Sequence, residues 1–210
     1  MVNLNDISKA LQRGKADKVS ELVNQALKED IVPKKILEKG LIHGMSIIGE
    51  KFKKNEVYVP EVLIAARAMH AGMDVLKPKL TETGVKNIGK VVMGTVKGDL
   101  HDIGKNLVEI MLEGAGFEII DLGTDVSPGK FVDAVKEYQP NVLGMSALLT
   151  TTMVYMPEVI QALHNAGLRD KEKIMVGGAP ITQNYANQIG ADGYSPDAAS
   201  TVDKAKTFLN

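Results

Sequence analysis

The hydrophobic residues up to Leu80 recur at spacings of three and four, which is the period of an amphipathic helix. Three long apolar faces and a shorter leading one have this period, at residues 19–27, 37–52, 62–76 and 4–11. Pro33 and Pro60 stand where helices are expected to begin. The pattern therefore predicts a bundle of about four helices in the first part of the chain.

The pattern changes at Lys90, where short apolar runs start to alternate with amphipathic stretches. The runs are KVVMGTV, FEIIDL, VLGMSAL, KIMVGG and ADGYS. Helices are expected between and after them, at residues 103–115, 127–138, 153–166, 181–189 and 197–208. Ser127 and Pro128 are suited to begin the second of these, as N-cap and first-turn residue.

Continuous apolar strands that alternate with helices indicate a parallel sheet covered on both faces. Five such units predict a flavodoxin-like, Rossmann-type α/β fold with strand order 2-1-3-4-5. The polar, glycine-bearing segment KLTETGVKNIG separates the two patterns. We expect a helical domain at residues 1–82, a linker at 83–89 and an α/β domain at 90–210.

Composition narrows the class of protein further. The net charge is −1, from 25 basic and 26 acidic residues, so no basic surplus favours nucleic acid or a membrane surface as partner. The chain has no cysteine, which excludes disulfides and cysteine-held metal clusters. No apolar run has the length of a membrane span, and the N-terminus lacks a signal-peptide core. We expect a cytoplasmic protein.

One histidine stands at the expected ligand site. Ligands of doubly wound sheets bind at the carboxyl ends of the strands, where the strand order reverses. There GTVKGDLHDIGKNLV carries His101, and Asp99 is close enough in sequence to hold one ring nitrogen. Asp102 and Gly104 then open a helix, and the glycine leaves room for a bulky group. The remaining histidines fit ordinary surface or core positions: His43, His70 and His164.

This histidine leaves two kinds of chemistry open. A single histidine without cysteine, and without a second histidine at ligand spacing, is a poor site for a free zinc or iron ion. It suits a metal already held by a macrocycle, which needs one axial ligand from the protein. It equally suits a catalytic pair of His101 with Asp99. Residue spacing alone does not decide between these two.

Three motifs resemble those of cobalamin-binding domains. Asp99-Leu-His101-Asp-Ile-Gly104 matches Asp-x-His-x-x-Gly, Ser146-Ala-Leu148 matches Ser-x-Leu, and Gly177-Gly178 matches Gly-Gly. The helical segment MSIIGEKFKKNEVYVPEVLIAARAM also looks like the cap module of methionine synthase and of small corrinoid proteins of anaerobes. The resemblance covers nearly the whole chain and implies a four-helix cap bundle followed by the cofactor-binding α/β domain.

The resemblance implies a cobalamin or related corrinoid, with cobalt, bound in the base-off/His-on state. His101 would replace the benzimidazole as lower cobalt ligand, and Asp99 would hold the imidazole from behind. Methionine synthase continues this relay with a serine, where this chain has Thr152, which keeps the hydroxyl. Asp102, Ile103 and Gly104 of the motif would adjoin the cofactor.

The remaining expected cofactor contacts surround the nucleotide tail and the upper face of the corrin. Ser146, Leu148 and Thr150 would line the channel for the tail, and Gly177 and Gly178 would leave space for it. Taken without the other motifs, the two glycines are better explained as a simple turn at the end of a strand, and the other motifs reverse that preference. In the cap, the residues aligned over the corrin are Phe52, Val59 and Val62, which also fit plain bundle core.

By resemblance, the chain carries a methyl group on cobalt from a substrate-specific methyltransferase to a second methyltransferase that acts on tetrahydrofolate or coenzyme M. It has no substrate-activating domain of its own, and a reductive activating protein is a further expected partner. Methanol, a methylamine or a phenyl methyl ether fit as donors. The alternatives are a cobalamin subunit of a radical mutase, which normally lacks the cap, and a cobalamin-dependent sensor, which needs a DNA-binding module.

Overall fold

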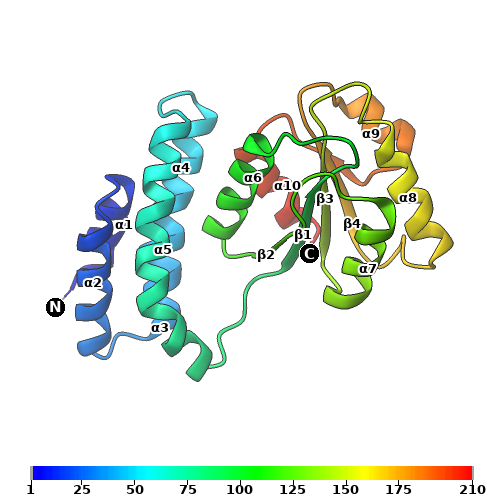
Figure 1. The fold of residues 1–210 in the computed structure, drawn as a ribbon. Helices are drawn as coiled ribbons and strands as arrows, with labels where there is room; N and C mark the ends of the chain where they lie inside the picture. Colours follow the sequence, from blue (N-terminus) through cyan, green and yellow to red (C-terminus); the bar gives the residue numbers. More distant parts are fainter. Residues whose placement is uncertain (1, 210) are drawn as a thin grey trace. The chain divides into compact units, whose positions relative to one another are not determined.

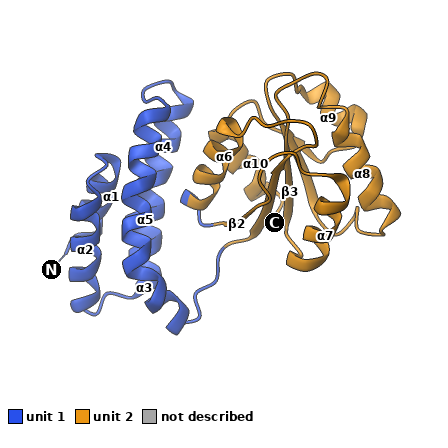
Figure 2. Ribbon diagram, viewed as in Figure 1, with its two compact units in different colours: residues 1–87, 114–116 blue, residues 88–113, 117–210 orange. Residues whose placement is uncertain are grey.

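The computed structural model describes residues 2–209 and divides into two compact units (Figure 2). The helical unit contains residues 1–87 with 114–116, and the sheet unit contains 88–113 with 117–210. No helix or strand is assigned between Glu82 and Lys90 in this described part of the chain. The domain boundaries at 82 and 90 stay a prediction.

The helical unit consists of four helical rods, as expected. Its elements are α1 (Leu4–Gln12), α2 (Ala16–Lys28), α3 (Pro33–Ile36), η1 (Leu37–Ile42), α4 (His43–Lys53) and α5 (Val59–Glu82). The elements α3, η1 and α4 follow one another without a break and form the third rod. Asn3 caps α1 by accepting a hydrogen bond from the N–H of Asn5 at 3.0 Å. The first four residues of KLTETGVKNIG belong to α5, so this segment is a linker only after Glu82.

The third rod contains one feature that the hydrophobic period did not predict. Its middle, η1, is a π-helix rather than an α-helix. Gly40 in η1 is buried, and a Cβ added there would lie 3.2 Å from Ile7 Cγ2 of α1. The wider turn therefore stands where α1 approaches the rod closely. A π-turn shifts the side chains of a helix by one residue, which apolar spacings of three and four do not reveal.

The sheet unit has the predicted parallel sheet (Figure 1). Its strands are β1 (Lys90–Thr95), β2 (Glu118–Asp121), β3 (Val142–Ser146), β4 (Lys173–Gly177) and β5 (Gly193–Tyr194), in the order β2-β1-β3-β4-β5. In the central register Val92 pairs with Ile120 and Leu143, and Leu143 pairs with Ile174. The strand order reverses between β1 and β3, so the carboxyl ends of these strands form the expected ligand site.

Helices cover both faces of this sheet. They are α6 (Ile103–Gly114), α7 (Pro128–Tyr138), α8 (Tyr155–Asn165), α9 (Gln183–Ile189) and α10 (Ala198–Thr207). Figure 1 shows α6 and α10 on one face, and α7, α8 and α9 on the other. Ser127 caps α7, since its hydroxyl accepts from the N–H of Lys130 at 3.4 Å. Each helix lies within two residues of its expected start.

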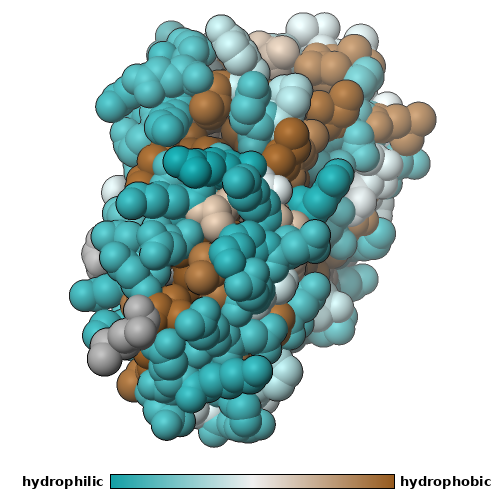
Figure 3. All heavy atoms as spheres, turned by 90° about the vertical axis from the view of Figure 1, so that its left-hand side faces the viewer, coloured by the Kyte–Doolittle hydropathy of each residue, from teal (hydrophilic) through white to brown (hydrophobic). Residues whose placement is uncertain are grey.

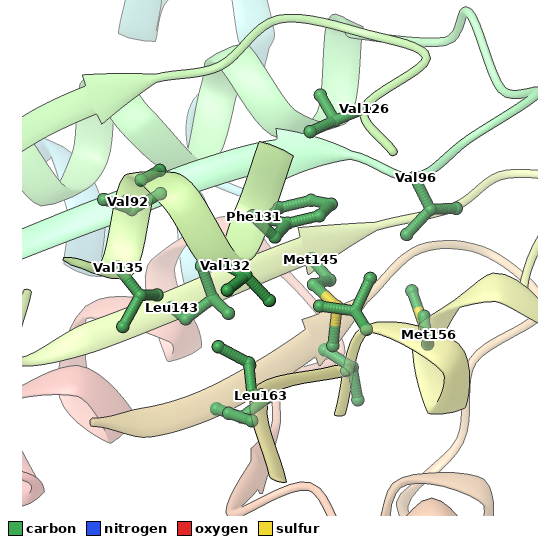
Figure 4. Packing of buried hydrophobic residues seen from close by; sticks show 14 of the residues in the cluster. Val92, Val96, Val126, Phe131, Val132, Val135, Leu143, Met145, Met156 and Leu163 are labelled. Carbon is green, nitrogen blue, oxygen red and sulfur yellow. The ribbon is translucent and has the colours of Figure 1, made fainter. Parts of the chain in front are cut away.

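The core of the sheet unit lies between the strands and the helices α7 and α8 (Figure 4). Phe131 of α7 is completely buried and packs with Val92 and Leu143 of the strands and with Met156 and Leu163 of α8. Burial of this aromatic ring and of the aliphatic side chains around it removes apolar surface from water. This packing makes the sheet a rigid support for the loops that leave its carboxyl ends.

Exposed large apolar side chains occur in both units of the described chain, for example Tyr58 in the helical unit and Leu100 in the sheet unit. The face drawn in Figure 3 is mainly hydrophilic, with hydrophobic atoms in smaller areas between polar ones. Among the helices of residues 2–209, none is long and apolar enough to cross a membrane.

Candidate functional site

The site begins in the loop that connects β1 to α6. Main-chain hydrogen bonds hold this loop, from Asp99 N to Val96 O at 3.1 Å and from Asp125 N to Asp99 O at 3.0 Å. The Thr95 hydroxyl donates to the carbonyl of His101 at 3.0 Å. The Asp125 carboxylate, in the loop after β2, accepts from the N–H of Gly98 at 2.7 Å. The loop is therefore fixed at both ends before any ligand binds.

The Asp99 carboxylate joins this loop to the segment after β3. Its side chain is 0% exposed. Oδ2 accepts from the Thr152 hydroxyl at 2.6 Å and from the N–H groups of Leu148 and Leu149 at 2.8 and 3.3 Å. Oδ1 accepts from the N–H of His101 at 3.1 Å. Donors from its own loop therefore satisfy Oδ1, and donors from the segment after β3 satisfy Oδ2.

These donors keep Asp99 ionised. Burial alone would raise the pKa of Asp99, because it removes the carboxylate from water. Four hydrogen bonds together outweigh burial and hold the pKa of Asp99 well below its usual range. They come from the Thr152 hydroxyl, from the N–H groups of His101 and Leu148, and from the His101 ring. The carboxylate can therefore act as a permanent negative acceptor behind the histidine.

This acceptor determines how the imidazole of His101 is held. Asp99 Oδ1 lies 2.7 Å from His101 Nδ1. Because an ionised carboxylate only accepts, Nδ1 carries the hydrogen, and a neutral ring then has its lone pair on Nε2. The His101 side chain is 51% exposed, whereas its partner is buried. The arrangement presents an oriented nitrogen ligand at the surface of the sheet unit.

Exposed apolar side chains lie beside His101 in the loop after β1 and in the segment after β3 that donates to Asp99. Leu100 and Ile103, on either side of His101 in sequence, are 72% and 79% exposed. Leu148, Leu149 and Val154, after β3, are also exposed. Apart from Ile88, these are the large exposed apolar residues of the sheet unit in its described part. An apolar surface beside an oriented, half-exposed histidine fits a large hydrophobic ring system that carries a metal.

The ends of β4 and β5 provide space rather than charge. A Cβ added to Gly177 would have one neighbour within 4 Å, the carbonyl oxygen of Ser195 at 3.9 Å. Gly178 has φ +128°, and a Cβ there would overlap the carbonyl oxygen of Ala147, so this position requires glycine. The buried hydroxyl of Ser195 has no hydrogen-bond partner within the described chain. The open space at Gly177 leaves room for a ligand segment beside the end of β4.

The structure brings the sequence-predicted residues of the sheet unit to one edge. Asp102 and Gly104 lie at the start of α6, and a Cβ added to Gly104 would have no neighbour within 4 Å. Ser146 is the last residue of β3, and Thr150 is exposed in the following segment. The predicted cap residues belong to the helical unit instead: Phe52 and Val59 are partly buried, and Val62 is completely buried. Their role over a cofactor stays a prediction.

A buried lysine cluster connects α6 with the end of β2, and motif reasoning missed it. Lys105 is buried, and its ammonium group donates to Glu109, Asp121 and Asn106, each at 2.8 Å. Asp121 also accepts from the N–H of Gly123 at 2.7 Å. The cluster therefore anchors the first turns of the helix that follows His101. A lysine one residue after a motif glycine is a weak signal, because lysine is usually solvated.

Charges and burial shift the pKa values of this cluster in different directions. Burial would lower the pKa of Lys105, but hydrogen bonds and charge from Asp121 and Glu109 outweigh it and raise this pKa. Burial raises the pKa of Glu109 to about 7, against the opposing effect of Lys105. Burial would also raise the pKa of Asp121, but Lys105 and the N–H of Gly123 lower it. Lys105 and Asp121 thus form the permanent ion pair, and Glu109 is the group that titrates.

Comparison with protein families gives two matches that together cover most of the chain. Residues 89–203 match the B12 binding domain, and residues 4–77 match a second family model that is also described as a B12 binding domain. The first match contains the loops after β1, β3, β4 and β5 that form the site.

Individual relatives span the helical and the sheet unit. The chain is 46% identical over 192 residues to the trimethylamine corrinoid protein of Methanosarcina barkeri, covering 90% of this chain and 88% of the relative. It is 46% identical over 209 residues to dimethylamine corrinoid protein 1 of Methanosarcina mazei, covering 98% and 95%. Among solved structures, the methanol:cobalamin methyltransferase complex of Methanosarcina barkeri has a chain with TM-score 0.86, 31% identity and coverage of 97% and 78%.

The lysine cluster predicts a pH dependence of stability. The folded state keeps a proton on Glu109 up to about pH 7, whereas the unfolded chain releases it near the ordinary value of 4.5. The free energy of unfolding should therefore fall as pH rises through this window. Glu109→Gln should flatten that fall, measured by urea unfolding at about pH 5 and about pH 7.5. Glu158→Gln, on the exposed side of α8, is the control, and an equal fall in both variants would contradict the assignment.

Proposed function

Since this chain belongs to the family of B12-binding domains, we propose that it carries a methyl group on a bound corrinoid from one methyltransferase to another. The observation that supports this proposal most directly is the half-exposed His101, which the buried Asp99 orients and exposed apolar side chains surround. The names of the relatives, corrinoid proteins for trimethylamine and dimethylamine, support the same function.

His101 is the residue that would hold the cofactor through its metal. The bound corrinoid supplies a cobalt ion able to accept and release a methyl group. The bond to Asp99 occupies Nδ1 of His101, so Nε2 is the nitrogen that would hold the cobalt if the corrinoid binds base-off/His-on. Asp99 keeps the ring in this tautomer and orientation, and Thr152 keeps the Asp99 carboxylate in place. Leu100 and Ile103 offer apolar contact to the ring system.

The nucleotide tail of the cofactor would enter beside β4. The space at Gly177 supports this placement, whereas Gly178 is required by the close approach of the Ala147 main chain. Ser146 and Thr150 add hydroxyl groups at the neighbouring strand end. In this arrangement Gly177 would keep the channel open, and the hydroxyl groups would replace the water that the tail loses on binding.

The helical unit is proposed to act as a cap. Phe52 and Val59 would exclude water from the upper face of the corrin, and Val62 is best explained as bundle core because it is completely buried. A partner methyltransferase must reach the same face, so the cap must move away during transfer. The segment between Glu82 and Lys90, which has no helix or strand, is suited to be the hinge.

The chain contains no substrate site of its own in this proposal. The first partner is a substrate-specific methyltransferase, as in the methanol:cobalamin methyltransferase complex that contains a similar chain. Methylamines are the preferred donor class, because the relatives named for trimethylamine and dimethylamine are 46% identical to this chain. A second methyltransferase acting on tetrahydrofolate or coenzyme M, and a reductive activating protein, complete the system.

The lower-ligand assignment can be tested on the cobalt(II) form of the corrinoid-loaded protein. Its paramagnetic resonance spectrum should show hyperfine splitting from one axial nitrogen of His101. His101→Ala should abolish that splitting, whereas His164→Ala, which changes an exposed histidine of α8, should leave it intact. Splitting that persists in His101→Ala would show that another nitrogen is the lower ligand.

The role of the threonine can be tested with neighbouring residues. Thr152→Val removes the hydroxyl that donates to Asp99 but keeps the shape of the side chain, so we expect corrinoid affinity to fall by about 10- to 100-fold. Thr151→Val changes an exposed hydroxyl one residue earlier and should leave affinity unchanged. Equilibrium titration with cobalamin measures both, and equal affinities would refute the relay.

Methyl carriage itself predicts transfer of label. The full chain, loaded with reduced corrinoid, is mixed with a methylamine-specific methyltransferase and an isotopically labelled methylamine. Label should elute with this chain in an amount stoichiometric with cobalt, and His101→Ala should reduce it. Methanol and a phenyl methyl ether, each with its own methyltransferase, test the donor class. Absence of label with all these donors would overturn the carrier function.

A further inference from the structure

A chain of hydrogen bonds leads from the buried lysine of α6 back to the residue that follows His101. Lys105 donates to the side-chain oxygen of Asn106 at 2.8 Å, and the side-chain amide of Asn106 donates to the Asp102 carboxylate at 3.2 Å. The main-chain N–H of Asn106 also donates to the carbonyl of Asp102, at 2.8 Å. Asp102 is therefore tied to the first turn of α6 by its side chain and by its main chain.

A second chain of hydrogen bonds starts from the same ammonium group and reaches His101 itself. Asp121 accepts from Lys105 at 2.8 Å and from the N–H of Gly123 at 2.7 Å. The carbonyl of Gly123 accepts from the N–H of the buried Thr95 at 3.0 Å. The Thr95 hydroxyl donates to the carbonyl of His101, also at 3.0 Å. This second chain therefore ends on the main chain of the proposed cobalt ligand.

The two chains and the Asp99 carboxylate hold different parts of His101. Asp99 accepts from the main-chain N–H and from Nδ1 of His101, so it holds the ring and the amino side of the residue. The chains from Lys105 hold its carbonyl side and the residue that follows. The direction of the ring and the position of the main chain that carries it are thus set by separate groups.

Stability alone does not account for a lysine at this position. Lys105 is 2% exposed, and removing an ammonium group from water costs free energy that its partners must offset. Replacement of a buried ion pair by apolar side chains of similar volume is often neutral or stabilising. An apolar side chain lacks the three donors that hold Asn106 and Asp121 at defined distances. The distinctive contribution of the lysine is therefore geometric.

We propose that Lys105 is a positioning residue for His101, which fixes the main chain at the edge of the sheet and thereby the reach of Nε2 toward cobalt. The inference rests on the proposed function, because it concerns the lower ligand of a bound corrinoid. Since Lys105 is buried, it acts through the two chains of hydrogen bonds rather than by touching the cofactor. Removal of a group that supports a metal-binding histidine typically lowers metal affinity by about 10- to 100-fold.

The test is a double-mutant cycle on the full chain, with cobalamin affinity measured by equilibrium titration. Lys105→Met keeps an unbranched side chain but removes the donors, and it should lower affinity by about tenfold when His101 is present. In a His101→Ala background the same substitution should have almost no further effect, because the ligand that it positions is absent. Equal losses in both backgrounds would show a general effect on the fold and overturn the proposal.

A matched control separates the lysine from its charge. Lys136→Met makes the same substitution at an exposed lysine of α7 and should leave cobalamin affinity unchanged. Lys105→Met leaves Asp121 without its cation, but the side chain of Asp121 is 45% exposed and can be hydrated, so we expect the variant to fold. A loss of the same size in Lys136→Met would assign the effect to net charge and contradict positioning.

A milder variant keeps the test decisive if Lys105→Met does not fold. Asn106→Leu breaks the side-chain link to Asp102 and leaves the ion pair with Asp121 in place, so it should lower affinity less, and again only when His101 is present. Asn184→Leu, at an exposed position of α9, should have no effect. Parental cobalamin affinity in Asn106→Leu would then overturn the proposal.

The paramagnetic resonance spectrum of the cobalt(II) form gives an independent readout. In Lys105→Met and Asn106→Leu, a smaller share of the cobalt should show splitting from the axial nitrogen of His101. In the corrinoid-free chain, amide hydrogen exchange at His101 should be faster in the same variants than in the parent. A parent chain without nitrogen splitting would overturn the lower-ligand assignment and this inference with it. Splitting in the parent that both variants retain in full would overturn this inference alone.

Discussion

The candidate site depends on the burial of one charge. The Asp99 carboxylate is removed from water, so its two oxygens must be satisfied by the protein. The donors come from its own loop, through His101, and from the segment after β3, through Leu148, Leu149 and Thr152. These two segments are therefore held together without any cofactor. An oriented imidazole is the consequence of satisfying a buried anion.

The parallel sheet explains why this anion can be buried here. Interior strands such as β1 and β3 pair with a neighbour on each side, so their main-chain polar groups become free only at the strand ends, where the loops begin. At the carboxyl ends of β1 and β3, the N–H groups of the following residues point beyond the sheet and become donors for an anion. The cluster around Lys105 stabilises the same carboxyl-end edge next to β1, since it joins α6 to the end of β2.

The sequence contained most of the fold and part of the site. The strand order follows from the alternation of buried strands and amphipathic helices, and Asp99 with His101 is recognisable from a motif spacing. The π-helical turn at Leu37–Ile42 was missed, because it coincides with a tertiary contact, the close approach of α1 at Gly40, which apolar spacing does not encode. The Thr152 hydroxyl on Asp99 was expected from the resemblance, but the donors from Leu148 and Leu149 were missed, since they are main-chain N–H groups, which side-chain motifs do not encode.

Buried polar groups in the sheet unit divide into those that the protein satisfies and those that it leaves open. Asp99 and Lys105 each have several partners, and both hold the loop or helix that carries His101. Glu172 and the Ser195 hydroxyl lack partners in the described chain. An unpaired buried group destabilises the folded state unless something else supplies its hydrogen bond. The satisfied groups therefore hold His101 in place, whereas Glu172 and Ser195 lower the free energy of unfolding by an amount that the packing of the sheet unit has to offset.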